Sequence, residues 1–220
     1  MAGAPASARL VLATHNRKKL VELLAILHAE PGLADLPDDA VVTAGDLDAP
    51  EPVEDGVTFA ENALIKARAL ASATGLPAVA DDSGLSVDVL GGAPGIFSAR
   101  WAGRHGDDAA NLELLLGQLG DVRDEHRAAA FVCAAALVTP DGREEVAMGE
   151  MPGVLVRSPR GTGGFGYDPI LVPVEQPAGP DGAPGRRTSA ELSAAEKNAI
   201  SHRGKALRSL APAIAAALRP

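Results

Sequence analysis

The sequence is short of cysteine, of aromatic residues and of clustered positive charge, and each shortage narrows the possible functions. A single cysteine, Cys133, excludes an intrachain disulfide framework and a cysteine-based zinc site. The formal net charge of −9 and the lack of a long lysine or arginine run argue against binding to a nucleic-acid backbone. No apolar stretch is long enough to span a bilayer, and the first residues lack the apolar core of a secretory signal. We therefore expect a cytoplasmic protein that binds neither nucleic acid nor membranes.

The composition supports a full hydrophobic core. Hydrophobic residues make up 46 % of the 220 residues, whereas aromatic residues make up only 3 %. Alanine, valine, leucine and isoleucine must therefore build the core, and the few aromatic side chains stand out as candidates for a specific role. We expect a flexible N-terminus over residues 1–8 and a single domain over residues 9–220.

The first half of the chain alternates strand and helix patterns. Residues 8–14 predict a strand, and the leucine spacing after Asn16 predicts a helix that ends near the next Pro-Gly pair. Thr58 and Glu61 have the spacing of a capping box ahead of a second helix, which Gly75 ends. Strand, helix and strand in succession indicate an α/β protein.

The second half adds a hairpin to this pattern. The apolar run LPAVA predicts a short strand that ends at two acids, and residues 107–119 predict a helix. The turn signal Pro-Asp-Gly at 140–142 separates two strand-like runs, and PGVLV is a candidate further strand. The C-terminal segment predicts a helix interrupted at Gly204 and Pro212. These elements favour a central mixed sheet flanked by helices, with a purely doubly wound sheet as the alternative.

Two adjacent acids, Asp81 and Asp82, follow the run LPAVA and precede Ser83. Neighbouring carboxylates repel each other, and burial of either requires a positive partner. Carboxylates at a strand end suit Mg²⁺, which takes few oxygen ligands from the protein, and one acid can accept a proton from an attacking water. A simple turn explains Asp-Asp-Ser-Gly equally well. Glu54, in the acidic loop upstream, is a candidate second carboxylate.

The polar segment THNRKK lies between the first strand and the first helix. Backbone N–H groups at a helix start favour anions, and Arg17, Lys18 and Lys19 add full positive charges. The segment is therefore a candidate phosphate cradle, although it lacks the glycines and the GK[ST] of a Walker loop. A helix start capped by Asn16, with a solvated basic turn, is the alternative.

The segment GTGGFGYD combines four glycines with two aromatic residues. Glycines permit close backbone approach to a flat ligand, and Phe165 and Tyr167 offer faces on which a base can stack. Asp168 can accept a hydrogen bond from a ring N–H. A flexible turn with buried aromatic residues is the alternative interpretation.

Charged residues also gather in EKNAISHRGK, residues 196–205. On a regular helix Lys197 shares a face with Ser201, while His202 and Arg203 point elsewhere. A regular helix would therefore not aim Lys197 and His202 at one ligand unless a bend intervenes. A charged, solvated helix face is the simpler reading of this segment taken alone.

Four segments occur together in one order: ATHNRKK, ADDSGLSVDVLGGAPGIFSARW, GTGGFGYDP and TSAELSAAEKNAISHRGKAL. From about residue 10 to about residue 210 the chain resembles the Ham1/RdgB-type nucleoside triphosphate pyrophosphatases, also called inosine triphosphate pyrophosphatases. The resemblance implies Mg²⁺-dependent hydrolysis of ITP, dITP and XTP to the monophosphate and pyrophosphate, which removes deaminated purines from the nucleotide pool. It also implies an elongated, two-lobed α/β fold of the ITPase/Maf-like kind and a homodimer.

The resemblance also assigns roles to individual residues. It makes Asp82 the water-activating acid and a metal ligand together with Glu54. It implies that the substrate is bound by Thr14, Asn16 and Lys19, with His15, Arg17 and Lys18 beside them, by Ser83, by a base pocket of Phe165, Gly166, Tyr167 and Asp168, and by Lys197, His202 and Arg203. In this assignment His202 and Arg203 donate to the 6-oxo group of the purine, and such donors would reject the 6-amino group of adenine.

Two other functions remain open on the sequence. A Maf-like pyrophosphatase would act on pyrimidine triphosphates, which the SHR segment disfavours. A nucleotide sensor without turnover would gain little from repelling carboxylates. Two departures from the family pattern are His15, where many members carry glycine, and a long Pro/Gly-rich insert at 176–187.

Overall fold

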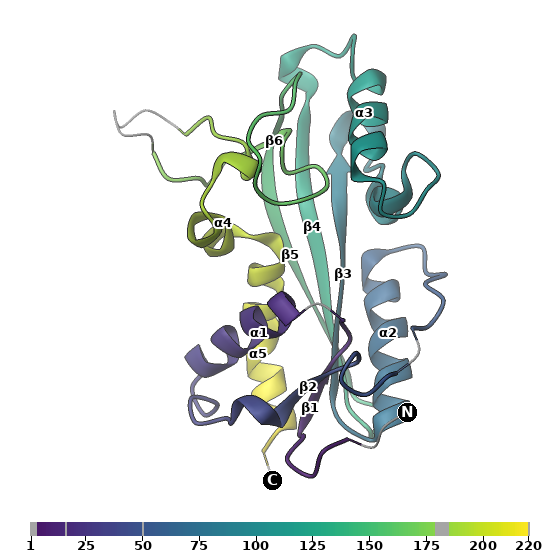
Figure 1. Cartoon of the computed structure of the whole chain (residues 1–220), viewed down its shortest axis with the longest axis vertical. Helices are drawn as coiled ribbons and strands as arrows, with labels where there is room; N and C mark the ends of the chain where they lie inside the picture. The colour runs from purple at the N-terminus through teal and green to yellow at the C-terminus, as the bar shows by residue number, and fades with distance from the viewer. Residues whose placement is uncertain (1–3, 16, 50, 179–184, 220) are drawn as a thin grey trace. The chain divides into compact units, whose positions relative to one another are not determined.

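The structure, a computed structural model, describes residues 4–15, 17–49, 51–178 and 185–219 (Figure 1). Within these ranges six strands form one sheet in the order β2-β1-β3-β4-β5-β6. Strand β1 pairs in parallel with β2 and β3, whereas β5 pairs antiparallel with β6. The predicted mixed sheet flanked by helices is confirmed, and the antiparallel pair excludes a purely doubly wound sheet. Residues 179–184 of the Pro/Gly-rich insert lie outside the described ranges.

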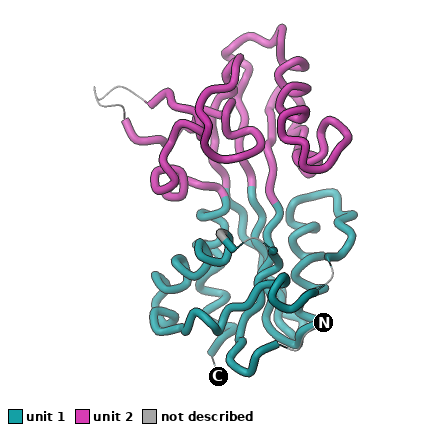
Figure 2. The backbone as a smooth tube through the Cα atoms, in the orientation of Figure 1, with its two compact units in different colours: residues 1–82, 133–149, 203–220 teal, residues 83–132, 150–202 magenta. Residues whose placement is uncertain are grey.

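The chain divides into two compact units (Figure 2). Unit 1 comprises residues 1–82, 133–149 and 203–220, and unit 2 comprises residues 83–132 and 150–202. Three long strands contribute residues to both units: β3 (Ala78–Val87), β4 (Ala128–Val138) and β5 (Glu144–Leu155). The assignment of residues 9–220 to a single domain stays a prediction.

Unit 1 packs helices on both faces of its part of the sheet (Figure 1). Its complete elements are β1 (Leu10–Leu12), α1 (Arg17–Ala29), a short 3₁₀ turn (Asp38–Ala40), β2 (Val41–Thr43) and α2 (Phe59–Thr74), and it holds α5 (His202–Ala217) from Arg203 onward. Because side chains alternate along a strand, Leu10 and Leu12 pack with α1 and α5, whereas Val11 packs with α2. The same alternation continues along β3, where Val79 packs in the cluster of Leu10 and Leu12 and Ala78 packs in the cluster of Val11.

Helix α2 begins and ends where the sequence predicts. The Thr58 hydroxyl accepts from the Glu61 N–H, and the Glu61 carboxylate accepts from the Thr58 N–H, which completes the capping box. Gly75 closes the helix in the left-handed conformation, with φ of 67°. These caps fix the register of α2 and therefore the direction of its side chains.

Unit 2 has its own core around the remaining parts of β3, β4 and β5. Its other elements are α3 (Asp108–Gln118), β6 (Leu171–Pro173), α4 (Ala194–Ile200) and the 3₁₀ turns Asp88–Leu90, Gly95–Arg100, Asp124–His126 and Ser189–Glu191. The buried Arg127 guanidinium donates to the carbonyls of Leu119, Leu155 and Val156 and so joins the end of α3 to β4 and β5. None of the helices described in either unit is both long and apolar enough to cross a membrane.

Three predicted boundaries were wrong. Strand β3 does not end at the acids but continues through them to Val87, because cationic side chains from other elements pair with the carboxylates. The PGVLV segment is the end of β5 up to Leu155 and not a separate strand. The C-terminal helix breaks at Ser201, whose extended backbone has φ of −62° and ψ of 142°, and both Gly204 and Pro212 lie inside α5.

Candidate active site

The carboxyl end of β1 lies at a point where the connectivity of the sheet changes direction. From β1 the chain runs through α1 to β2, which lies on one side of β1 in the sheet. It then runs through α2 to β3, which lies on the other side of β1. Ligands of open α/β sheets bind outside such switch points. The pairing of β1 with β3 ends at Leu12 and Val79, and a pocket of about 760 Å³ lies at this point. Its polar lining consists of Thr14, His15, Arg17, Lys19, Glu51, Glu54, Lys66 and Asp81.

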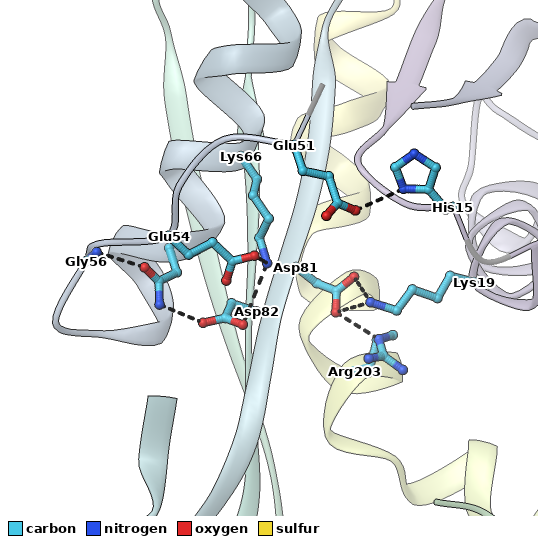
Figure 3. Close-up of polar contacts among 10 residues, drawn as sticks. His15, Lys19, Glu51, Glu54, Gly56, Lys66, Asp81, Asp82 and Arg203 are labelled. Carbon is cyan, nitrogen blue, oxygen red and sulfur yellow. Dashed lines mark hydrogen bonds and ion pairs between the residues drawn. The ribbon is translucent and has the colours of Figure 1, made fainter. Parts of the chain in front are cut away.

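Asp81 and Asp82 point to opposite faces of β3 (Figure 3). Consecutive strand residues alternate, so Asp81 follows Val79 toward α1 and α5, while Asp82 follows Ala80 toward α2. The two carboxylates are therefore adjacent in sequence without facing each other. Because each carboxylate meets its own cations on its own face, the chain tolerates two neighbouring acids in this strand.

Asp81 is bound by two cations on its face of the sheet. Its two carboxylate oxygens each accept from Lys19 Nζ at 3.0 Å, and Oδ2 also accepts from Arg203 Nε at 3.0 Å. Burial by itself raises the pKa of Asp81, but the charges of Lys19 and Arg203 outweigh it and hold the pKa well below its ordinary value. Asp81 is consequently a fixed anion and a poor proton acceptor.

Asp82 contacts a different set of groups on the α2 face (Figure 3). Lys66 Nζ lies 3.6 Å from Asp82 Oδ1 and 3.3 Å from Glu54 Oε1, and Asn62 Nδ2 donates to Asp82 Oδ2 at 3.1 Å. An ammonium group thus lies between two carboxylates from separate elements. Hard oxygen ligands around a cation position fit Mg²⁺, which takes one or two carboxylates and completes its shell with water and phosphate. No group of three or more acidic, histidine or cysteine side chains suited to a metal occurs among the described residues.

The predicted phosphate loop lies at the start of α1. Thr14 is buried, and its backbone carbonyl accepts from the Gly45 N–H. His15 Nδ1 lies 2.9 Å from Glu51 Oε1, and Arg17 donates to Asp46 at 2.7 Å, both at exposed positions. Two further predicted phosphate contacts, Asn16 and the side chain of Lys18, lie outside what the structure describes.

Unit 2 contains a second pocket, of about 120 Å³. The residues that line it include Ser83, Gly84, Phe131, Phe165, Gly166, Tyr167, Asp168, Lys197 and His202. Phe165 is 69 % exposed, and Lys197 Nζ lies 5.3 Å from the centre of its ring. His202 stacks on Phe131 with ring centres 5.2 Å apart and an interplanar angle of 19°. The pocket therefore offers an exposed ring, a cation and an imidazole to one ligand.

Hydrogen bonds to two buried side chains, Asp168 and Tyr167, hold the glycine-rich loop of this pocket. Asp168 Oδ2 accepts from the Phe165 N–H at 2.9 Å and from Lys197 Nζ at 2.6 Å. Gly164 has φ of +74°, and a side chain there would collide with the Asp168 carboxylate, so the loop requires glycine at this position. Tyr167 is buried and donates to the Ser98 carbonyl at 2.9 Å; burial raises the pKa of its phenol above the ordinary value.

The break at Ser201 brings Lys197 and His202 to the same pocket. On one continuous helix these side chains would point in different directions, so the bend that the sequence argument required is present. Arg203 belongs to the last segment of unit 1, and its Nε donates to Asp81; its contact to the purine stays a prediction. The SHR segment therefore supplies one residue to the unit 2 pocket and one cation to the buried acid.

A profile of the Ham1 family matches residues 10–213. The chain belongs to the Ham1 family. The dITP/XTP pyrophosphatase of Streptomyces coelicolor is 63 % identical over 206 residues, which cover 94 % of this chain and 96 % of the relative. The dITP/XTP pyrophosphatase of Corynebacterium efficiens is 57 % identical over 208 residues, which cover 94 % and 97 %.

Solved Ham1-family structures support the same assignment. The crystal structure of a nucleoside-triphosphatase/dITP/XTP pyrophosphatase from Mycobacterium abscessus matches with a TM-score of 0.74 at 51 % identity and covers 93 % of this chain and 99 % of that one. A HAM1 protein from Coxiella burnetii matches with a TM-score of 0.79 at 40 % identity and covers 96 % and 100 %.

Sequence reasoning missed several residues that line or contact the candidate site. Asn62 and Lys66 are four residues apart on α2 and so share a face. The capping box at Thr58 predicts where this helix begins, so the shared face could have been predicted from the sequence. Phe131 is one of four phenylalanines, which could have marked it as a ring near a ligand. Asp108 had no readable signal; its carboxylate accepts from the Gly166 N–H at 2.8 Å, a contact that only the fold creates.

Proposed function

We propose that this chain hydrolyses dITP and XTP to the monophosphate and pyrophosphate. One observation carries the proposal: the two faces of β3 hold complementary charge sets in unit 1. The set of Lys19, Asp81 and Arg203 has two positive charges and one negative, whereas the set of Glu54, Lys66 and Asp82 has two negative charges and one positive. A triphosphate needs cations for its oxygens, and a metal that neutralises it needs carboxylates. The names of the relatives support the same substrates.

The two acids take different parts in the proposed reaction. Glu54 and Asp82 would hold Mg²⁺, which supplies charge neutralisation to the departing pyrophosphate and lowers the pKa of a bound water. Asp82 accepts the proton of the water that attacks the α-phosphorus, and the bond from that phosphorus to the bridging oxygen of the β-phosphate breaks. Asp81 takes no proton, because Lys19 and Arg203 bind its oxygens; it holds Lys19 in place for the phosphates.

The unit 2 pocket selects the base in this proposal. Phe165 stacks on the purine, and the Asp168 carboxylate fixes Lys197 above the Phe165 ring. A His202 N–H donates to the 6-oxo group, and it cannot accept from the 6-amino group of adenine. Discrimination against dATP therefore comes from an unpaired donor. Mg²⁺ as cofactor and a homodimer belong to the proposal through the family resemblance, and a cytoplasmic location belongs to it as the expectation from the sequence.

A panel of natural and deaminated triphosphates tests the proposal. The purified chain with Mg²⁺ should release pyrophosphate from dITP and XTP and little from dATP, dCTP or dTTP. Asp82→Asn should abolish turnover while dITP still binds, whereas Asp121→Asn, at an exposed position, should behave as the wild type. Release of single phosphates would contradict the reaction, preference for pyrimidines would support the Maf-like alternative, and binding of dITP without hydrolysis would support a sensor.

A further inference from the structure

Asn62 joins two elements of unit 1 through one buried side chain. It lies in the first turn of α2 and is 2 % exposed. Its Nδ2 donates to Asp82 Oδ2 at 3.1 Å, and its Oδ1 accepts from the Gly56 N–H at 2.9 Å. Figure 3 shows Gly56 and Glu54 on the loop beside Asp82. One amide thus connects β3 to the acidic loop that carries Glu54, two residues before Gly56.

An amide is the side chain that this position needs. The carboxylate of Asp82 only accepts, and the Gly56 N–H only donates, so the bridging group must present a donor on one side and an acceptor on the other. A side chain on Gly56 would collide with Asn62, so the loop approaches as closely as glycine permits. Asn62 therefore fixes which oxygen of Asp82 is occupied and leaves Oδ1 to face Lys66, at 3.6 Å.

We propose that Asn62 is a positioning residue that orients the Asp82 carboxylate for proton transfer and holds the Glu54 loop against it. The inference rests on the proposed function, because it assigns Asp82 its role in hydrolysis. A reacting group displaced by about 1 Å costs on the order of 100-fold in rate. Loss of the amide donor should therefore lower kcat at least about tenfold.

Asn62→Asp separates the two bonds of the bridge. The new carboxylate still accepts from the Gly56 N–H, but in its ionised form it has no hydrogen to donate to Asp82. Under the proposal kcat for dITP falls at least about tenfold. The affinity for Mn²⁺ alone, measured by electron paramagnetic resonance, should stay the same or increase, because the variant adds a negative charge beside the metal ligands. Gln118→Glu makes the same amide-to-acid change at an exposed position and keeps its acceptor for Trp101, so its kcat should equal that of the wild type.

Each result decides between orientation and simple loop anchoring. If Asn62 only anchors the loop, Asn62→Asp retains wild-type kcat and only Asn62→Ala is impaired, which would overturn the proposal. If neither variant folds, a crystal structure of the wild type with Mn²⁺ and a non-hydrolysable dITP analogue decides. An Asn62–Asp82 distance within hydrogen-bond range supports the inference, and a separation beyond 4 Å refutes it. An inactive wild type would refute the proposed function instead.

Discussion

Asp81→Asn should lower the free energy of unfolding by about 3–5 kcal/mol, because removal of the acidic partner from a buried ion-pair set takes away the charge that offsets Lys19 and Arg203. The Asp81 side chain is 4 % exposed, and its partners Lys19 and Arg203 are 26 % and 14 % exposed. Asparagine fills nearly the same volume, so the loss is electrostatic and leaves no cavity. For a chain of this length the cost corresponds to a fall in Tm of about 6–20 °C.

Thermal unfolding followed by circular dichroism measures this effect, and an exposed ion pair supplies the control. Arg68 donates twice to Glu144 at 2.7 Å, a geometry as good as that at Asp81, but both partners are about a third or more exposed. Glu144→Gln should therefore cost less than about 1 kcal/mol. Equal losses in the two variants would refute the claim that burial makes the Asp81 set decisive for stability.

Three other side chains give independent tests. Phe165→Ala should weaken dITP binding by about 5- to 150-fold, the equivalent of a stacking contribution of about 1–3 kcal/mol, without a change in Tm, because the ring is exposed; unaltered binding would remove Phe165 from the base pocket. Burial raises the pKa of the Cys133 thiol to about 12, so a disulfide reagent at pH 8 should react only after unfolding, and rapid labelling of the native protein would contradict this. Hydrogen bonding from Arg187 lowers the pKa of Glu196 to about 2, below the pKa of glutamate in the unfolded chain. The ionised Glu196 therefore stabilises α4 fully at pH values above the unfolded pKa, and this stabilisation is lost as the pH falls through about 2. Nuclear magnetic resonance should follow this titration, and a midpoint near pH 4 would show that the pairing is absent.

Local signals in the sequence predicted the elements that depend on local chemistry. The capping box at Thr58 and the glycine at 75 fix both ends of α2 through groups within a few residues. The turn at 140–142 joins β4 to β5 as Pro-Asp-Gly predicts. The family motifs also pointed to Asp82, Phe165 and the SHR segment; the structure places Phe165 and His202 at one pocket, and the catalytic and binding roles of these residues stay predictions.

The boundaries that failed depend on partners distant in the sequence. Strand β3 continues through its acids because Lys19 and Arg203 pair with Asp81. These partners lie 62 and 122 residues away from Asp81 in the sequence, so no local pattern predicts the pairs. The helix break at Ser201 brings Lys197 and His202 to one pocket, whereas Gly204 and Pro212, residues that usually interrupt a helix, lie within α5. The role of Asn62 also required the fold, since Gly56 and Asp82 approach it from different elements.

The alternation of Asp81 and Asp82 across β3 makes this segment sensitive to length rather than to side-chain size. Deletion or insertion of one residue between Ala78 and Ala80 would shift the strand register by one and exchange the destinations of the two acids. The carboxylate suited to catalysis would then meet Lys19 and Arg203, and the one matched to those cations would meet Lys66. Variants of this strand can therefore exchange one small apolar residue for another, but a frame-preserving indel should inactivate the protein even where it still folds.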